Sequence, residues 1–334
     1  MDKTFCKDVC VSIAQYVNAS IIGLSQINRY WHDVIKYSYG AWQYATLEFC
    51  MWTLLTETFS KYENSKLQHL RLYSANGNCF DMSSILSKFS GLRSLRVPSD
   101  MQWKIMIENK IVIPQLQSLE IASGLMYESE AVQIAFLFPN LTRLLIDQHV
   151  KITQDALQYF STSLLALKQL FLPRIYGANG SMVDSFDLRC FPLLTDLAVF
   201  GTIKTIQTQA TSLILRLYDN PLSSCQVIAT LGSQILHLNV QFTSNQPQSQ
   251  TCCEFIQVLQ PLYQLRTLKM HNFKTNRVSV LANALGCFPQ LRDVQFTGKL
   301  RQLGEYDFEV CANNMAQKIP KLQYFYWNGH VKVF

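Results

Sequence analysis

Apolar residues recur along most of the chain in one six-residue pattern, apolar-x-x-apolar-x-apolar. It reads LRSLRV at residues 92–97, LQSLEI at residues 116–121 and LRTLKM at residues 265–270. The copies begin at residues 44, 67, 92, 116, 141, 167, 194, 212, 235, 265, 291 and 322, at intervals of 18 to 31 residues. Because the end of each copy alternates between apolar and polar, the pattern predicts a short strand with one buried face.

The segments between the copies have a different periodicity. Apolar side chains at three- and four-residue spacing predict helices over residues 82–89, 131–137, 156–160 and 255–259. Prolines precede many copies, at residues 114, 139, 192, 261, 289 and 320, where they favour an end to the helix. A lone strand and helix cannot bury both faces, whereas stacked copies can. The pattern therefore predicts an α/β fold with a parallel inner sheet and outer helices.

This organisation resembles the leucine-rich-repeat family, whose repeats run roughly 20–29 residues. The resemblance covers about residues 44–327 and implies that residues 46–334 form a leucine-rich-repeat solenoid. The asparagine that often follows the strand in such repeats is mostly missing, with Asn220 and a few others near that turn. The alternative is an ordinary α/β domain rich in leucine.

The first 45 residues lack the repeat. Apolar residues at positions 5, 9, 13, 16 and 17 mark one helical face, and a second apolar set runs from residue 21 to residue 35. The run FCKD at residues 5–8, the pair Tyr16-Val17, the aliphatic step at residues 21–24, and Trp31 and Trp42 match the order and spacing of an F-box. The segment therefore resembles the F-box family, the helical motif that docks onto the Skp-type adaptor of cullin–RING ubiquitin ligases.

The F-box resemblance implies a substrate-recognition subunit, with residues 1–45 as a small helical module that binds the adaptor. The adaptor-binding residues would be Phe5, Val9, Ile13, Ile21, Leu24, Ile27, Trp31 and Trp42. The alternative is a non-catalytic scaffold or assembly factor whose N-terminal helices only cap the solenoid. Capping segments are required for the solubility of repeat proteins, and Cys6 stands where the F-box usually has proline.

Partner recognition is expected on the inner, concave face of the sheet. The residues between the leucines point there by period-two alternation. The predicted target-binding residues are Arg71, Tyr73, Arg96, Arg143, Phe171, Arg216, Tyr218, His237, Lys269 and Tyr324. Arginine and tyrosine are common at binding hot spots, and a row of arginines suits an acidic or phosphorylated segment of a protein substrate. A merely solvated sheet face is the alternative.

Composition changes this picture little. The net charge is +6, without a basic run, so a nucleic-acid partner is disfavoured. We find no pattern of a signal peptide, a membrane span, a metal site, a phosphate-binding loop or a nucleophile with its base. The ten cysteines contain no C-x-x-C pair and are interpreted as buried, reduced thiols. We expect no enzymatic activity, no cofactor, no metal and no membrane association, and a cytoplasmic or nuclear location.

Overall fold

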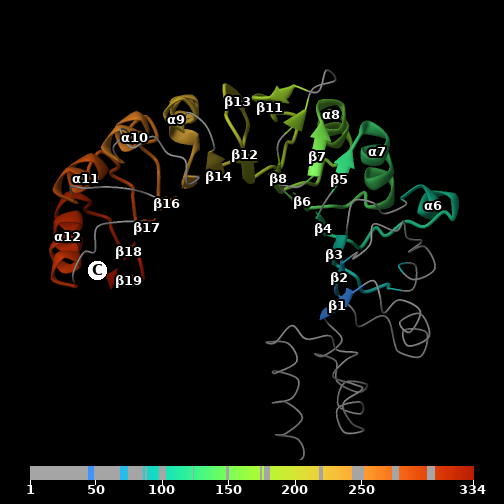
Figure 1. Ribbon diagram of the computed structural model, residues 1–334, viewed down its shortest axis with the longest axis horizontal. Helices are drawn as coiled ribbons and strands as arrows, with labels where there is room; N and C mark the ends of the chain where they lie inside the picture. The colour runs from blue at the N-terminus through green and yellow to red at the C-terminus, as the bar shows by residue number, and fades with distance from the viewer. Residues whose placement is uncertain are drawn as a thin grey trace, which may run out of the picture. The chain divides into compact units, whose positions relative to one another are not determined.

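The computed structural model describes part of the chain, which divides into two compact units, Met1–Leu167 and Lys168–Phe334 (Figure 1). The described residues are 44–48, 68–73, 86, 89–97, 103–122, 124–147, 150–173, 175–176, 181–217, 221–242, 252–272, 278–298 and 305–334. Residues 1–43, with all eight predicted adaptor-binding residues, therefore lie outside the described part.

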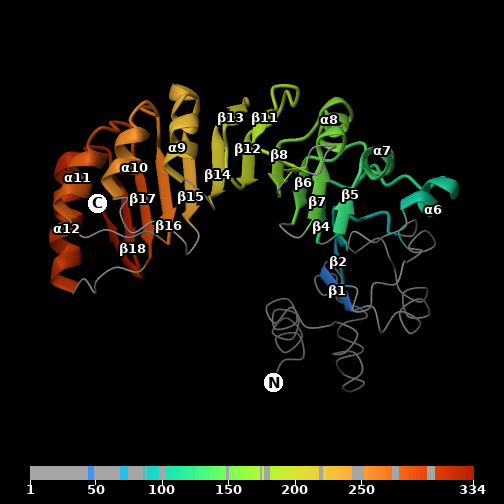
Figure 2. The same ribbon diagram turned by 45° about the horizontal axis from the view of Figure 1, so that its top comes forward.

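The first unit is built on parallel strands with helices along one side (Figures 1 and 2). Its ladder runs β1 (Tyr44–Glu48), β2 (His69–Tyr73), β3 (Ser94–Val97), β4 (Ser118–Ile121) and β6 (Arg143–Ile146). The short strands β5 (Gly124–Met126) and β7 (Val150–Thr153) form a separate parallel pair. The helices are α6 (Trp103–Glu108), α7 (Glu128–Leu137) and α8 (Gln154–Ser163).

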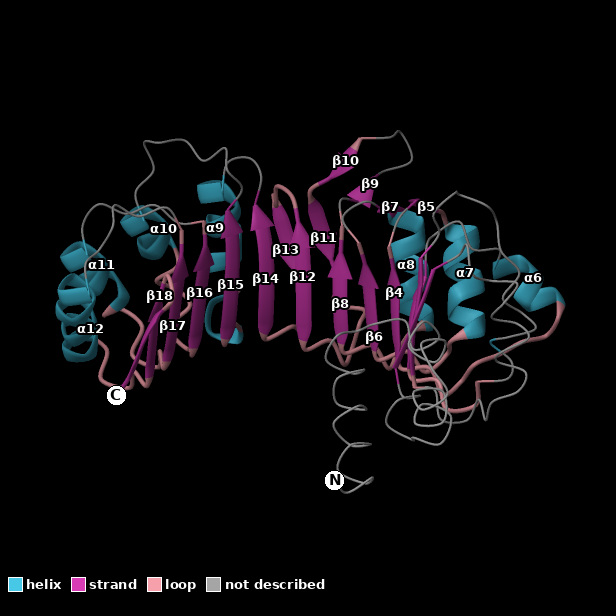
Figure 3. Ribbon diagram, turned by 60° about the horizontal axis from the view of Figure 1, so that its bottom comes forward, coloured by secondary structure: helices cyan, strands magenta, loops and turns pink. Residues whose placement is uncertain are grey.

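The second unit repeats this plan (Figure 3) and ends in a hairpin of β18 and β19 (Figure 1). Its ladder runs β8 (Gln169–Leu172), β12 (Asp196–Phe200), β14 (Ser212–Leu217), β15 (His237–Phe242), β16 (Thr267–His271), β17 (Asp293–Thr297) and β18 (Tyr324–Trp327), all parallel, with antiparallel β19 (His330–Val333) at the edge. Its helices are α9 (Pro221–Ala229), the 3-10 turn η4 (Gly232–Gln234), α10 (Cys252–Val258), α11 (Val278–Leu285) and α12 (Glu305–Lys318).

The same turn precedes most of the strands and sets their register. The leucine N–H donates to the carbonyl of the residue three positions earlier, as in Leu141 to Phe138 at 3.3 Å and Leu291 to Phe288 at 3.2 Å. Pro139 and Pro289 occupy the second position of these two turns, where the fixed φ of proline is favourable. The predicted role of proline in ending the segment before the strand is confirmed at these positions.

A shared carbonyl then aligns each strand with its predecessor. The Arg266 carbonyl, for example, accepts the N–H groups of Arg292 at 2.8 Å and Asp293 at 3.1 Å. The Arg93 carbonyl accepts those of Gln117 and Ser118 in the same way, at 2.8 and 2.9 Å. The recurrence of this bond in both units explains why successive copies stay in register despite unequal lengths.

The leucines of the pattern form the core. Burial alternates along the strands, and Leu119, Leu144 and Leu268 are 0% exposed while their strand neighbours are half-buried or exposed. The register places Leu238 opposite Leu268 and Leu268 opposite Val294, so each leucine stacks on the next repeat. The described residues thus have the predicted α/β architecture of stacked repeats with a parallel sheet.

The predicted helices are confirmed in three of four segments, as α7, α8 and α10. In the fourth, only Leu86 is described as helical. The connections around β12 differ, because their described residues contain no helix. They contain instead the short parallel strands β11 (Ser185–Asp187) and β13 (Thr205–Gln207). Before them, β9 (Ile175–Tyr176) pairs antiparallel with β10 (Met182–Val183). Within the described part, no helix combines the length and the apolar character that a membrane crossing requires.

Two of the few asparagines near the end of a strand, Asn272 and Asn328, have a structural role there. Asn272 and Asn328 directly follow β16 and β18 with φ of 58° and 43°, the left-handed region that asparagine tolerates. Asn272 donates to the Phe242 carbonyl at 2.9 Å, and Asn328 exchanges two hydrogen bonds of 2.9 Å with the backbone of Gly298. Each therefore ties the end of its strand to the preceding repeat.

Strands β18 and β19 form a tight hairpin at the edge of the sheet. Asn328 and Gly329 connect β18 to β19, and both have positive φ, as two-residue hairpin turns prefer. On the helix side of the hairpin, Lys332 contacts Glu309 and donates to Asn313 of α12 at 3.1 Å. The Asn-Gly pair at residues 328–329 is the local sequence signal that could have predicted this hairpin.

Candidate interaction surface

Side chains that alternate with the buried leucines define one surface in each unit, which we call the helix-free face. In the first unit the structure places Arg71, Arg96 and Arg143 on it. In the second unit it places Phe171, Arg216, His237, Lys269 and Tyr324 there. The strand position of Tyr73 is described but its side chain is not, and Tyr218 lies outside the described residues.

The arginines of the first unit do not form a uniformly unpaired basic wall. Arg96 and Glu120 are neighbours in the β3–β4 register and form an ion pair of 2.9 Å, with 25% of each side chain exposed. The charge of Arg96 is therefore compensated within the face. Arg96 is therefore a weaker candidate for binding an acidic segment of a target, because Glu120 on the neighbouring strand already supplies a carboxylate.

A histidine borders the first unit's arginines. His69 lies two residues before Arg71 on β2, and both burial and the positive charge of Arg71 lower the pKa of its imidazole, with burial the larger cause. The neutral imidazole is therefore favoured at this place, and it adds no further positive charge to the face.

In the second unit the register aligns side chains in rows across the strands. One row near the start of the strands holds Ser212, His237, Thr267, Asp293 and Tyr324. The next row holds Ile214, Asn239, Lys269, Gln295 and Tyr326. Because strands in a ladder lie about 4.8 Å apart, neighbours in a row are within side-chain reach of each other.

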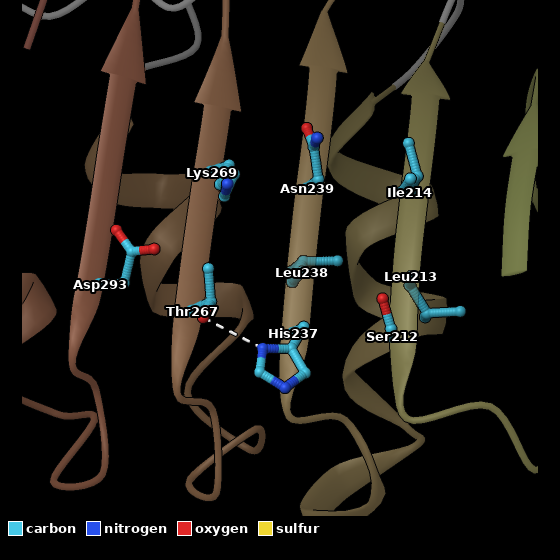
Figure 4. A pocket seen from close by; sticks show the side chains of 9 residues that line it. All are labelled: Ser212, Leu213, Ile214, His237, Leu238, Asn239, Thr267, Lys269 and Asp293. Atoms are coloured by element: carbon cyan, nitrogen blue, oxygen red, sulfur yellow. Dashed lines mark hydrogen bonds between the residues drawn. The ribbon is translucent and has the colours of Figure 1, made fainter. Parts of the chain in front are cut away.

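A hollow of about 310 Å³ opens over strands β14 to β17 (Figure 4). It is lined by Ser212, Leu213, Ile214, His237, Leu238, Asn239, Thr267, Lys269 and Asp293. The sequence picked out only His237 and Lys269 of this set as site residues. Ser212, Ile214, Asn239, Thr267 and Asp293 follow from the same alternation, whereas Leu213 and Leu238 belong to its buried phase. Only the register of four strands shows that these residues surround one space.

Hydrogen bonds hold two imidazoles of the second unit at fixed positions. His237 Nδ1 lies 3.0 Å from Thr267 Oγ1, and His271 Nδ1 lies 2.8 Å from Thr297 Oγ1 (the first bond is drawn in Figure 4). Both bonds join a strand to its next neighbour. Burial, and secondly the charge of Lys269, lowers the pKa of His271. The two histidines thus bind threonines and not each other.

The two polar groups in the middle of the hollow lack such partners. Asn239 and Lys269 are register neighbours on β15 and β16, and Figure 4 shows their side chains side by side. Among the described residues, no group forms an ion pair with Lys269, and the buried Oδ1 atom of Asn239 receives no hydrogen bond. Asp293, in contrast, accepts from Gln295 Nε2 at 3.3 and 3.4 Å.

Arg216 is held within the face. Its Nε donates to Gln241 Oε1 on the next strand at 3.3 Å, and its guanidinium lies 5.4 Å from the ring centre of Phe200. Both contacts use groups of the same face, so this arginine is oriented by its neighbours. Phe171 is half-buried, on the same side of β8.

Beside the hollow, the last hairpin offers exposed apolar groups, which we call the hairpin ridge. It consists of Tyr324, Tyr326, Val331 and Val333, which the β18–β19 register places opposite one another in two pairs. Tyr324 is 49% exposed, Val331 60% and Val333 63%. Below them a buried aromatic cluster fixes the hairpin, with Phe325 stacked on Phe308 at 5.6 Å and edge-on to Trp327 at 5.9 Å.

Other chemistry is limited in the described part of the chain. No group of three or more His, Cys, Asp or Glu residues is placed to hold a metal ion there. Cys225 and Cys311 are buried, which raises the pKa of each thiol to about 12. The expectation of buried thiols is confirmed for these two and wrong for Cys190 and Cys287, which are exposed. All four are free thiols.

Comparison with known proteins adds little to this description. No family model matches the chain, and no curated protein sequence is similar to it. Among solved structures, it is similar to the TLR13–ssRNA13 complex, with 15% identity, a TM-score of 0.42, and 78% of this chain and 39% of that chain covered. It is also similar to an internalin (inlF) from Listeria monocytogenes, with 13% identity, a TM-score of 0.34, and 79% of this chain and 61% of that chain covered.

The chain thus spans less than two thirds of the length of either solved structure. The repeat architecture described above is established by the chain's own strand register and burial.

Proposed function

We propose that this protein is a non-catalytic, protein-binding receptor whose target docks on the helix-free face of the repeats. The observation that carries the proposal is the alternation on strands β14 to β18. Their leucines are buried, whereas their polar and aromatic neighbours line a hollow and an exposed ridge. Protein interfaces favour such sets of aromatic anchors surrounded by oriented polar groups.

The finer proposal is a substrate-recognition subunit of a Skp–cullin–F-box ubiquitin ligase. Its support is the F-box resemblance of residues 1–45, which precede the repeats directly. In such a complex the receptor performs no chemistry of its own. It raises the effective concentration of the bound target near the transferring enzyme.

Co-purification with a Skp-type adaptor tests the finer proposal. Ile13→Asp and Trp31→Ala should abolish adaptor capture, because each removes an apolar contact from the predicted docking surface. Lys269→Glu is the matched control, since it changes the helix-free face and should leave adaptor capture intact. Adaptor capture that survives both N-terminal variants would show the ligase proposal to be wrong.

A scaffold or assembly factor with a capping N-terminus is the second candidate. The residue that favours it is Cys6, which replaces the usual F-box proline. A cap is coupled to the stability of the repeats, whereas a docking module is not. In this case Ile13→Asp should lower the thermal midpoint of the repeats, and no adaptor should co-purify with the unaltered chain.

A further inference from the structure

The charge on the second unit's helix-free face points to the chemistry of the target. Apart from its histidines, this face carries four acidic or basic side chains in the described strands: Asp196, Arg216, Lys269 and Asp293. Asp196 accepts from Gln169 and Thr195, Asp293 accepts from Gln295, and Arg216 is held by Gln241 and Phe200. Of these four, Lys269 is the one whose charged atom has no partner among the described residues.

The place of Lys269 favours its interaction with a negative charge from a ligand. Its side chain is half-buried in the hollow and faces other polar groups. A partly desolvated ammonium gains more from a carboxylate than an exposed one does, because the surrounding protein screens the pair less. The hollow therefore favours a ligand that supplies a negative charge at Nζ.

Asn239 indicates which chemical group of the ligand lies beside its negative charge. Its Oδ1 atom is buried without a donor, and an unsatisfied buried acceptor costs about 1–3 kcal/mol. Rotation of the carboxamide about its terminal bond brings either its oxygen or its nitrogen to the open side. A carboxamide has one acceptor and two donors, which match the N–H and C=O of a peptide group.

The hairpin ridge supplies an apolar contact at a defined distance. Lys269 on β16 and Tyr326 on β18 lie in the same row, separated by β17. Two strand spacings make about 10 Å, which an extended segment that crosses the strands covers in about three residues at about 3.3 Å each. An anchor on the ridge is thus within reach of the segment that fills the hollow.

We propose that the hollow binds a glutamate or aspartate of an extended segment of the target through Lys269, with Asn239 bound to a peptide group. An apolar or aromatic side chain about three residues away in that segment packs on Tyr324 and Tyr326. This rests on the proposed function, because it names the target chemistry of that same face. A polyanion fits less well, since one uncompensated lysine beside Asp293 offers few phosphate contacts.

The test uses the full chain and short synthetic peptides in a glycine-serine background, each with one glutamate and one phenylalanine at varied separation. We expect binding, measured by fluorescence anisotropy, to be strongest at a separation of about three residues. Lys269→Glu should weaken it about tenfold, as loss of a charge pair in an interface does. Replacing the peptide's glutamate by lysine should restore binding to that variant and to no other.

Controls separate this proposal from the broader one. Lys318→Glu makes the same charge change on α12, at an exposed position away from the face, and should leave binding unchanged. Tyr324→Ala should weaken binding about tenfold, whereas Asn239→Leu, of similar shape, should weaken it a few-fold. Thermal melts of all variants check that each one is folded.

Three results would overturn the proposal: equal binding of glutamate and lysine peptides, no peptide binding at millimolar concentration, or tighter binding of phosphoserine peptides or a single-stranded oligonucleotide. The broader function fails differently. If Tyr324→Ala abolishes peptide binding while Lys269→Glu does not, the face is a protein-binding surface without the proposed carboxylate contact. If neither variant nor any peptide has an effect, both proposals fail.

Discussion

The middle rows of the two helix-free faces both hold basic residues and differ in the groups that lie beside them. In the first unit Arg96 meets Glu120 on the next strand, and the two form an ion pair. In the second unit the neighbours of Lys269 in its row are Asn239 and Gln295, which carry no charge. The free charge of a repeat face therefore depends on which residues the register places beside each cation, and not on the number of cations in the pattern.

The largest change in stability is expected at a buried residue of β18, compared with its exposed neighbour on the same strand. Phe325 is 0% exposed in the aromatic cluster under the hairpin, so Phe325→Ala should lower the free energy of unfolding by about 3–5 kcal/mol. Tyr324→Ala, its exposed neighbour, should cost less than about 1 kcal/mol. Urea unfolding followed by circular dichroism measures both. Similar losses for the two variants would contradict the assignment of Tyr324 to the helix-free face.

The next effect breaks the charge compensation of the first unit. Glu120→Gln removes the negative charge of Glu120 from the partly buried Arg96 and should cost about 1 kcal/mol. Asp187→Asn, in the exposed pair with Arg189, is the matched control and should have little effect on stability. If the two substitutions are equally neutral in urea unfolding, the Arg96–Glu120 pair does not stabilise the first unit.

The same change sharpens the comparison by making the first unit resemble the second. With Glu120 neutral, Arg96 loses the carboxylate that the next strand supplies. Glu120→Gln should therefore add weak binding of the glutamate–phenylalanine peptides to the first unit. The double variant with Lys269→Glu should retain this binding, with an affinity a few-fold above that of Lys269→Glu alone. A peptide titration of the double variant checks this. No binding by the double variant would show that compensation is not what distinguishes the two faces.

The smallest effect concerns the histidine beside each basic residue. Burial first, and the neighbouring cation second, lower the pKa of His69 beside Arg71 and of His271 beside Lys269. Arg71→Met should raise the pKa of His69 part of the way towards its ordinary value, and Lys269→Met should do the same for His271. Burial prevents a full return in both. NMR titration of the imidazole protons measures each shift, and an unchanged pKa would contradict the charge contribution.

These histidines also give the pH dependence of stability a definite sign. Because the pKa of each is lowered in the folded state, the unfolded chain binds more protons just below the ordinary histidine pKa of 6.5. Their contribution to stability is complete above that pH and is lost as the pH falls through the folded-state pKa. Urea unfolding at pH 7.5 and at pH 5.5, about one unit on each side, should show lower stability in the more acidic buffer. His271→Gln should reduce that difference.

Much of the fold could be predicted from the sequence because the signal is local and repeated. Each copy of the pattern predicts one strand, as LRTLKM does for β16. The alternation alone predicts that Leu268 is buried and that Lys269 lies on the other face. The helices α7, α8 and α10 follow from apolar spacing in the same way. The segments around β12 could not be predicted with the same rule, because short strands replace the helix and leave no periodic pattern.

The sequence by itself determined the number and phase of the strand copies and the side to which each side chain points. These depend only on neighbours along the chain. Tertiary structure alone decided that Arg96 forms an ion pair with Glu120, that Lys269 lies beside Asn239, and that nine residues from four strands surround one hollow. Those contacts join residues about a repeat apart. They depend on the strand register, which the shared backbone carbonyls set. A slip of one residue would move the side chains of a strand to the opposite face of the sheet.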